Sequence, residues 1–229
     1  MIEFVTLMSL TLTVFVYFGS KTLYGHFRFV LFSPLLLSPV VLIIGLLTFH
    51  IPYASYNNGG KWLTMLLQPA IVAFALPLHK HYEILKKYFV EIVLSVLAGT
   101  FSAFLSSVLL GLSANFHRQI IASLAPRSVT TPIAIDVSNN LGGIPSLTAG
   151  FVIITGLIGL LIGPLMIRLL NLRSPIAKGV LLGTSAHGCG TSIALTLGSL
   201  EGTIASLAMI FAGLATIFLA PIVFPLLLK

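Results

Sequence analysis

The sequence predicts an all-α integral membrane protein with about six transmembrane helices and two broken or re-entrant polar segments in an inverted repeat. Of its 229 residues, 57% are hydrophobic and 7% charged, and the apolar residues occur in long unbroken runs. A soluble domain carries about 25% charged residues, a disordered chain lacks such hydrophobicity, and a membrane β-barrel requires alternating apolar and polar positions. These three classes are therefore excluded.

Each predicted span is a run of about twenty apolar residues, the length that crosses the hydrocarbon core. The N-terminal run lacks the basic region and cleavage site of a signal peptide, so we expect it to be an uncleaved first span. After His50-Ile51-Pro52, the sequence YASYNNGG at 53–60 predicts a turn. The predicted spans are 4–20, 30–50, 62–79, 89–112, 147–170 and 203–227.

Two segments between these spans are too polar to be ordinary membrane helices. Residues 124–143 read LAPRSVTTPIAIDVSNNLGG and residues 183–194 read GTSAHGCGTSIA. Non-helical backbone at membrane depth is tolerated only where protein buries it or a water-filled cavity receives it. We therefore predict four spans in 1–118, followed by an inverted-repeat core in 119–229 that contains two spans and the broken segments 124–143 and 183–200.

The two polar segments also begin an internal repeat. The sequence TPIA at 131–134 aligns with TSIA at 191–194, and each is followed by a glycine-containing turn and a long apolar helix with proline near its end. The identity is low, so chance similarity between two apolar stretches is the alternative. Two oppositely oriented repeats with broken segments at mid-membrane are the architecture of secondary transporters.

The distribution of positive charge favours re-entrant segments. If both polar segments return to the side from which they enter, most Lys and Arg residues collect on one side; if both cross, the bias disappears. The re-entrant topology places both termini outside. The formal net charge of +7 then reflects loops that meet anionic lipid rather than a nucleic-acid site. The predicted cytoplasmic cations are Lys21, Arg28, Lys80, Lys86, Lys87, Arg168, Arg173 and Lys178, against Lys61, Arg118 and Lys229 outside.

Arg127 is the main candidate for substrate binding. A charged side chain at membrane depth costs roughly 2.5–3.5 kcal/mol on insertion scales, and a guanidinium binds a carboxylate through two parallel hydrogen bonds. The alternatives are an interfacial arginine that extends to lipid headgroups and an ion pair with Asp136. Further candidates for contacts to the same ligand are Ser128, Thr130, Thr131, Asn139, Ser185, His187, Gly190 and Thr191.

Two titratable residues are candidates for proton coupling. Asp136 either carries a proton or takes a structural role, as a partner of Arg127 or a turn cap. His187 suits a proton-coupled step because histidine titrates near neutral pH, although a lone membrane histidine is often a packing residue. We interpret Cys189 as a small buried side chain rather than a nucleophile. One histidine with one cysteine is too small a ligand set for a metal. We therefore expect no enzyme activity, no metal and no cofactor.

At these motifs the chain resembles the LrgB/CidB family of bacterial membrane proteins. The first family signature resembles L-x-P-[RK]-S-[IV]-T, matched by residues 124–130, and the second resembles G-x-[AS]-[SA]-H-[AG]-x-G-T, matched by residues 183–191. The tract SPIAKG at 174–179 matches the linker of the family. Small departures lie at 131–132 and 188–189, and the resemblance covers essentially the whole chain.

The resemblance implies two kinds of function. Bacterial members are described as holin-like or antiholin-like modulators of murein hydrolase activity and autolysis, and a similar region forms the C-terminal part of the plant plastidal glycolate/glycerate translocator. Arg127 and the broken segments favour a proton-coupled transporter, or its larger subunit, for small carboxylates such as pyruvate, glycolate or glycerate. The alternative is a holin/antiholin-like modulator that acts through membrane permeabilisation. Either reading implies a homo-oligomeric multi-pass protein of the bacterial cell membrane with a smaller LrgA/CidA-type partner.

Overall fold

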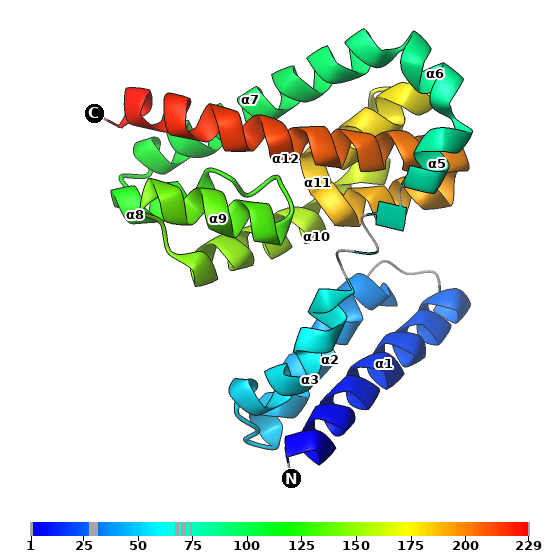
Figure 1. The fold of residues 1–229 in the computed structure, drawn as a ribbon, viewed down its shortest axis with the longest axis vertical. Helices are drawn as coiled ribbons and strands as arrows, with labels where there is room; N and C mark the ends of the chain where they lie inside the picture. Colours follow the sequence, from blue (N-terminus) through cyan, green and yellow to red (C-terminus); the bar gives the residue numbers. More distant parts are fainter. Residues whose placement is uncertain (1, 28–31, 67–68, 70–71, 74, 229) are drawn as a thin grey trace. The chain divides into compact units, whose positions relative to one another are not determined.

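The computed structural model describes residues 2–27, 32–66, 69, 72–73 and 75–228, and every element in them is a helix (Figure 1). The chain divides into two compact units, Met1–Ala75 and Leu76–Lys229. Four helices are long and apolar enough to cross a membrane, by length and composition: Phe89–Ser113, Pro145–Leu169, Pro175–Leu197 and Ser199–Leu227. The all-α membrane class is thus confirmed, while the count of six spans and the inverted repeat stay predictions.

The first unit consists of α1 (Ile2–Phe27), α2 (Pro34–Thr48) and α3 (Tyr53–Met65). α1 packs against both other helices, and the Thr13 and Tyr56 hydroxyls of α1 and α3 are hydrogen bonded at 2.8 Å. The expectation of a turn at 53–60 is wrong, because these residues are helical. Packing against α1 outweighs the weak helix propensity of Asn and Gly. Of the predicted span 62–79, residues 67–68, 70–71 and 74 lie outside the described residues.

The second unit begins with two short helices, α5 (Ala75–Lys80) and α6 (Tyr82–Lys87), and continues into the long α7 (Phe89–Ser113). It ends with α12 (Ser199–Leu227), which packs against α7, α9 (Thr131–Leu141) and α11 (Pro175–Leu197). Small residues at a helix interface allow close approach in membranes. The fully or almost fully buried alanines of α12 serve this purpose: Ala205, Ala208, Ala212, Ala215 and Ala220.

Residues 118–144 form a hairpin, called here the first hairpin. Helix α8 (Arg118–Leu124) ends before residues 125–130, which are not helical, and α9 follows. α9 ends at Gly142, whose φ of 82° is the left-handed conformation common at helix C-termini. The Ile144 N–H then donates to Ser123 Oγ at 2.7 Å. The chain therefore returns to the point that it left, as the re-entrant topology requires.

Helix α11 contains a second hairpin. Its backbone leaves the helical conformation at Ala186 (φ −133°, ψ 16°) and His187 (φ 40°, ψ −125°). Leu182 before the break and Ala194 after it lie in one buried cluster, and a Cβ at Gly190 would clash with the Leu182 carbonyl oxygen. Figure 1 shows both arms of α11 on the same side of the break. The 23 residues of α11 therefore do not form one straight span.

The two hairpins enter the second unit from opposite ends of α12. Beside the first hairpin, the Arg118 guanidinium donates to the Leu228 carbonyl at 3.1 Å, at the C-terminal end of α12. The second hairpin ends at Gly198, directly before α12 begins. Because 29 helical residues extend about 44 Å, the open ends of the hairpins are far apart and their tips point toward one another. The inverted repeat itself stays a prediction.

Gly190→Ala tests whether the two arms of α11 pack in this way. The added methyl group would force the arms apart, so we expect a loss of about 1–3 kcal/mol in the free energy of unfolding, as for other overpacked positions. Reversible denaturation in mixed detergent micelles measures this change. Gly188→Ala is the matched control, because a Cβ there meets nothing within 4 Å and should leave stability equal or slightly higher. Equal stability of the two variants would contradict the packed hairpin.

Candidate functional site

Arg127 lies at the tip of the first hairpin and contacts two of the helices that are long and apolar enough to cross a membrane. Its Nε–H donates to Ser107 Oγ of α7 at 2.9 Å, and its Nη1–H donates to Thr155 Oγ1 of α10 (Pro145–Leu169) at 3.5 Å. The second distance is long for a hydrogen bond. Among the described residues, the guanidinium forms no ion pair with Asp136 or any other carboxylate, and its Nη2 has no hydrogen-bond partner. Arg127 therefore retains donors for a ligand.

His187 lies at the tip of the second hairpin and is 8% exposed. Its Nε2 lies 3.2 Å from the Val152 carbonyl oxygen of α10. Because a carbonyl only accepts, Nε2 carries the proton in this bond. Its positive φ is uncommon for a residue other than glycine. Strained backbone of this kind persists where surrounding contacts hold it, and it clusters at functional sites.

The middle of α10 receives both tips. Val152, Thr155, Gly156 and Gly159 lie on one face of the helix, since residues three and four positions apart are neighbours. Gly156 lies against His187, where a Cβ would come within 2.9 Å of the imidazole Cε1. Thr155, which accepts the hydrogen bond from Arg127, directly precedes Gly156 in the chain. One face of α10 thus brings the two polar motifs of the sequence together.

A cavity of about 230 Å³ lies where the tips meet. Arg127 from the first hairpin and Ser185 from the second both line it, with Thr155 of α10. A larger cavity of about 600 Å³ shares Leu181 and Ser185 with it and extends between α7 and α11 toward Ser174, at the open end of the second hairpin. Thr184 lines this larger cavity, and its buried hydroxyl has no hydrogen-bond partner. The two cavities are therefore neighbours, on either side of Leu181 and Ser185.

Several predicted site residues lie near these tips without lining the smaller cavity. Ser128 is buried beside Arg127, and Thr130 and Thr131 form the start of α9. Thr191 donates to the His187 carbonyl at 3.0 Å, and Gly190 packs against Leu182. Their contacts are structural, and a direct role in substrate binding stays a prediction for each of them.

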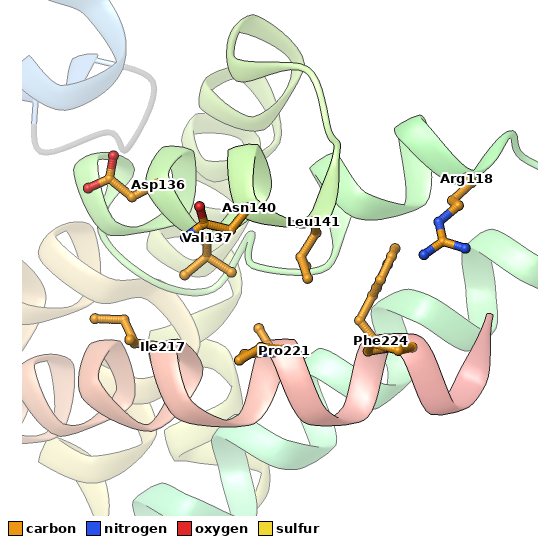
Figure 2. A pocket seen from close by; sticks show the side chains of 10 residues that line it. Arg118, Asp136, Val137, Asn140, Leu141, Ile217, Pro221 and Phe224 are labelled. Atoms are coloured by element: carbon orange, nitrogen blue, oxygen red, sulfur yellow. The ribbon is translucent and has the colours of Figure 1, made fainter. Parts of the chain in front are cut away.

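Asp136 and Asn139 are both exposed on α9. Asp136 lines a different cavity of about 320 Å³ between α9 and α12, together with Asn140 and Arg118. Figure 2 shows Asp136 and Arg118 at opposite ends of this cavity. The structure therefore separates Asp136 from the site at Arg127 and His187.

The sequence analysis did not identify Ser107, Thr155, Leu181 and Thr184. Ser107 and Thr155 are hydroxyl residues within otherwise apolar spans, and that is the signal by which they could have been found. In the part of the chain that the structure describes, no group of three His, Cys, Asp or Glu residues could hold a metal ion.

The chain is similar to known proteins over most of its length. The model of the LrgB-like family matches residues 13–226. The chain belongs to the LrgB family. It is 36% identical to Antiholin-like protein LrgB of Bacillus subtilis (strain 168) over 85% of this chain and 84% of that protein. It is 32% identical to Antiholin-like protein LrgB of Bacillus cereus (strain B4264) over 89% of each chain.

The chain is also 52% identical to Uncharacterized protein YwbG of Bacillus subtilis (strain 168), over 95% of this chain and 97% of that protein. No solved structure matches the chain. The resemblance to the LrgB family is thereby confirmed. The names of the antiholin-like relatives favour the alternative interpretation of the sequence over the carboxylate transporter.

Ser107→Ala tests whether Ser107 holds Arg127 in place. A buried donor left without its partner costs about 1–3 kcal/mol. Arg127 is half-buried, so we expect a loss of about 1 kcal/mol in the free energy of unfolding in detergent. Ser106→Ala is the matched control: both hydroxyls donate to the Ala103 carbonyl, but Ser106 is exposed. If Ser107→Ala and Ser106→Ala are equally stable, the contact with Arg127 contributes nothing to the fold.

Proposed function

We propose that this chain is an antiholin-like protein of the bacterial cell membrane that modulates murein hydrolase activity and autolysis through membrane permeability. Its similarity to two proteins named antiholin-like LrgB carries this proposal. The apolar helices of the second unit support its place in the bilayer. A smaller membrane protein of the LrgA/CidA type is the proposed partner.

Transport of a small carboxylate is the second candidate, and the cavity at Arg127 favours it. The cavity holds a guanidinium whose Nη2 is free and whose Nη1 makes only the 3.5 Å contact with Thr155. The edge formed by these two nitrogens matches the two oxygens of a carboxylate. Its volume of about 230 Å³ lies below the roughly 300–1,000 Å³ of sites for drug-sized ligands. This size favours small molecules such as pyruvate, glycolate or glycerate.

The tips of the hairpins supply further groups for this second candidate. Ser185 lines the cavity from the hairpin opposite to Arg127. Its hydroxyl donates to the Leu181 carbonyl at 2.6 Å, so it would exchange that bond for one to a bound carboxylate, which would then contact both hairpins. His187 is the better placed of the two candidates for proton coupling, because it contacts α10 beside Thr155. With Nε2 bonded to Val152, Nδ1 is the atom that would accept the proton.

The antiholin-like role predicts a change in autolysis. Deletion of the gene from its host should speed lysis and increase extracellular murein hydrolase activity, and expression of the chain should restore the original rate. Turbidity of the culture and zymography of the medium measure the two effects, with an empty vector as control. Unchanged lysis in the deletion strain would contradict this role.

The transport candidate predicts that Arg127→Lys, which keeps the charge but loses bidentate geometry, weakens substrate binding. One charge-assisted hydrogen bond contributes about 1.5–3 kcal/mol, so KM for pyruvate or glycolate should rise about tenfold or more. Uptake into sealed proteoliposomes, with and without the smaller partner, measures KM, and a trapped dye reports leakage. Arg168→Lys, at an exposed position in the last turn of α10, is the matched control.

Saturable uptake without dye leakage, weakened by Arg127→Lys but not by Arg168→Lys, would support the carrier. Dye leakage without saturation would support permeabilisation by a pore and leave Arg127 with a structural role. The autolysis experiment is independent of this result, because it measures the lysis of cells and not the uptake of a solute.

A further inference from the structure

The corner formed by α5, α6 and the start of α7 is fixed to the first half of α12. Leu85 of α6 is buried, and Leu78 and Leu207 pack in the same cluster. The His81 Nε2 is hydrogen bonded to the Ser199 hydroxyl at 3.1 Å. The rings of Phe89 and Phe211 meet edge to face with centroids 6.1 Å apart. This corner is therefore a fixed part of the second unit.

A cavity of about 500 Å³ opens in this corner. Its polar lining comes from His79, Tyr82 and Lys86, which are all exposed. Its apolar lining includes Phe89 and Leu207. The cavity therefore has two kinds of lining. One side offers hydrogen-bond donors and the positive charge of Lys86, and the other side is apolar.

The charges around the cavity favour an anionic ligand. Lys86 lines it, and Lys80 and Lys87 end the two short helices beside it. Among residues 75–228, no carboxylate forms an ion pair with Lys86. Glu83 lies on the same helix, and Glu91 lies on α7, but neither of them lines this cavity. The lining itself therefore carries positive charge alone.

The position of the cavity points to a lipid. α7 is one of the helices that are long and apolar enough to cross a membrane, and it begins at Phe89. The cavity thus lies at the end of a candidate span. If α7 crosses the bilayer, headgroups and acyl chains meet near this end of the helix. A soluble anion would match Lys86 but not the apolar wall, whereas a phospholipid matches both.

We propose that this cavity binds one anionic phospholipid of the bilayer. Its phosphate lies beside Lys86 with hydrogen bonds from Tyr82 and His79, and an acyl chain lies along Leu78, Phe89 and Leu207. Basic pockets between membrane helices bind anionic headgroups elsewhere by the same electrostatic attraction. The bound lipid joins α5 and α6 to α12 and is independent of the cavity at Arg127.

Native mass spectrometry of the full chain, released from nanodiscs that contain phosphatidylglycerol and phosphatidylcholine, tests this proposal. We expect one retained phosphatidylglycerol and its preferential retention over phosphatidylcholine. Lys86→Gln should weaken retention about fivefold, the effect of one cation near an anionic surface. Lys87→Gln is the matched control: it removes the same charge from the same helix outside the cavity, so it loses only the longer-range attraction and should weaken retention less than Lys86→Gln. Equal retention by these two variants would overturn the proposal.

Two further measurements separate a lipid from a free phosphate compound. Leu207→Trp fills the apolar wall without a change in charge, so it should displace the lipid; its thermal unfolding in detergent reports whether the fold is intact. Addition of glycerol 3-phosphate should not compete with the bound lipid. Competition at similar concentrations, or retention of phosphatidylcholine equal to that of phosphatidylglycerol, would contradict the phospholipid assignment.

Discussion

The second unit depends on the need to bury non-helical backbone within a membrane protein. An unpaired N–H or C=O in hydrocarbon costs several kcal/mol, so broken helices persist only where protein or a water-filled cavity surrounds them. The tips of the two hairpins meet this requirement: Ala125 and Val129 of the first and Ala186 of the second are almost fully buried. The face of α10 that contains Val152, Thr155 and Gly156 receives them. The cavity at Arg127 is the space that remains between these contacts.

Much of this arrangement could be predicted from composition, because the polar segments stand out against apolar runs. The sequence identified Arg127 and His187, and the structure places them at the two tips. The sequence could not place Asp136. The short distance in sequence between Asp136 and Arg127 does not show which side of α9 the carboxylate occupies. It also predicted a turn at 53–60, where local propensity favours a turn but packing against α1 makes a helix.

Ser107 and Thr155 show a further limit of sequence reasoning. Each belongs to a helix more than twenty residues long, and a hydroxyl in such a helix usually bonds to the carbonyl of its own preceding turn, as Ser107 also does. Only the tertiary contact with Arg127 distinguishes these two hydroxyls from the others. The break at His187 shows the same limit. Gly188 and Gly190 indicate a low helix propensity, but the direction of the second arm depends on its packing against Leu182, which the sequence does not show.

The two proposed functions differ in what they require of Arg127. Its insertion at membrane depth costs roughly 2.5–3.5 kcal/mol, and one well-formed hydrogen bond from a charged donor returns about 1.5–3 kcal/mol. The bond to Ser107 at 2.9 Å is of that kind, whereas the contact with Thr155 at 3.5 Å is weaker. Protein contacts alone therefore approximately balance the cost and leave Nη2 available. A purely structural arginine would gain more from a carboxylate neighbour, such as Asp136 on the adjacent helix. The chain instead keeps that carboxylate in another cavity, an arrangement that suits a guanidinium whose anionic partner comes from outside the protein.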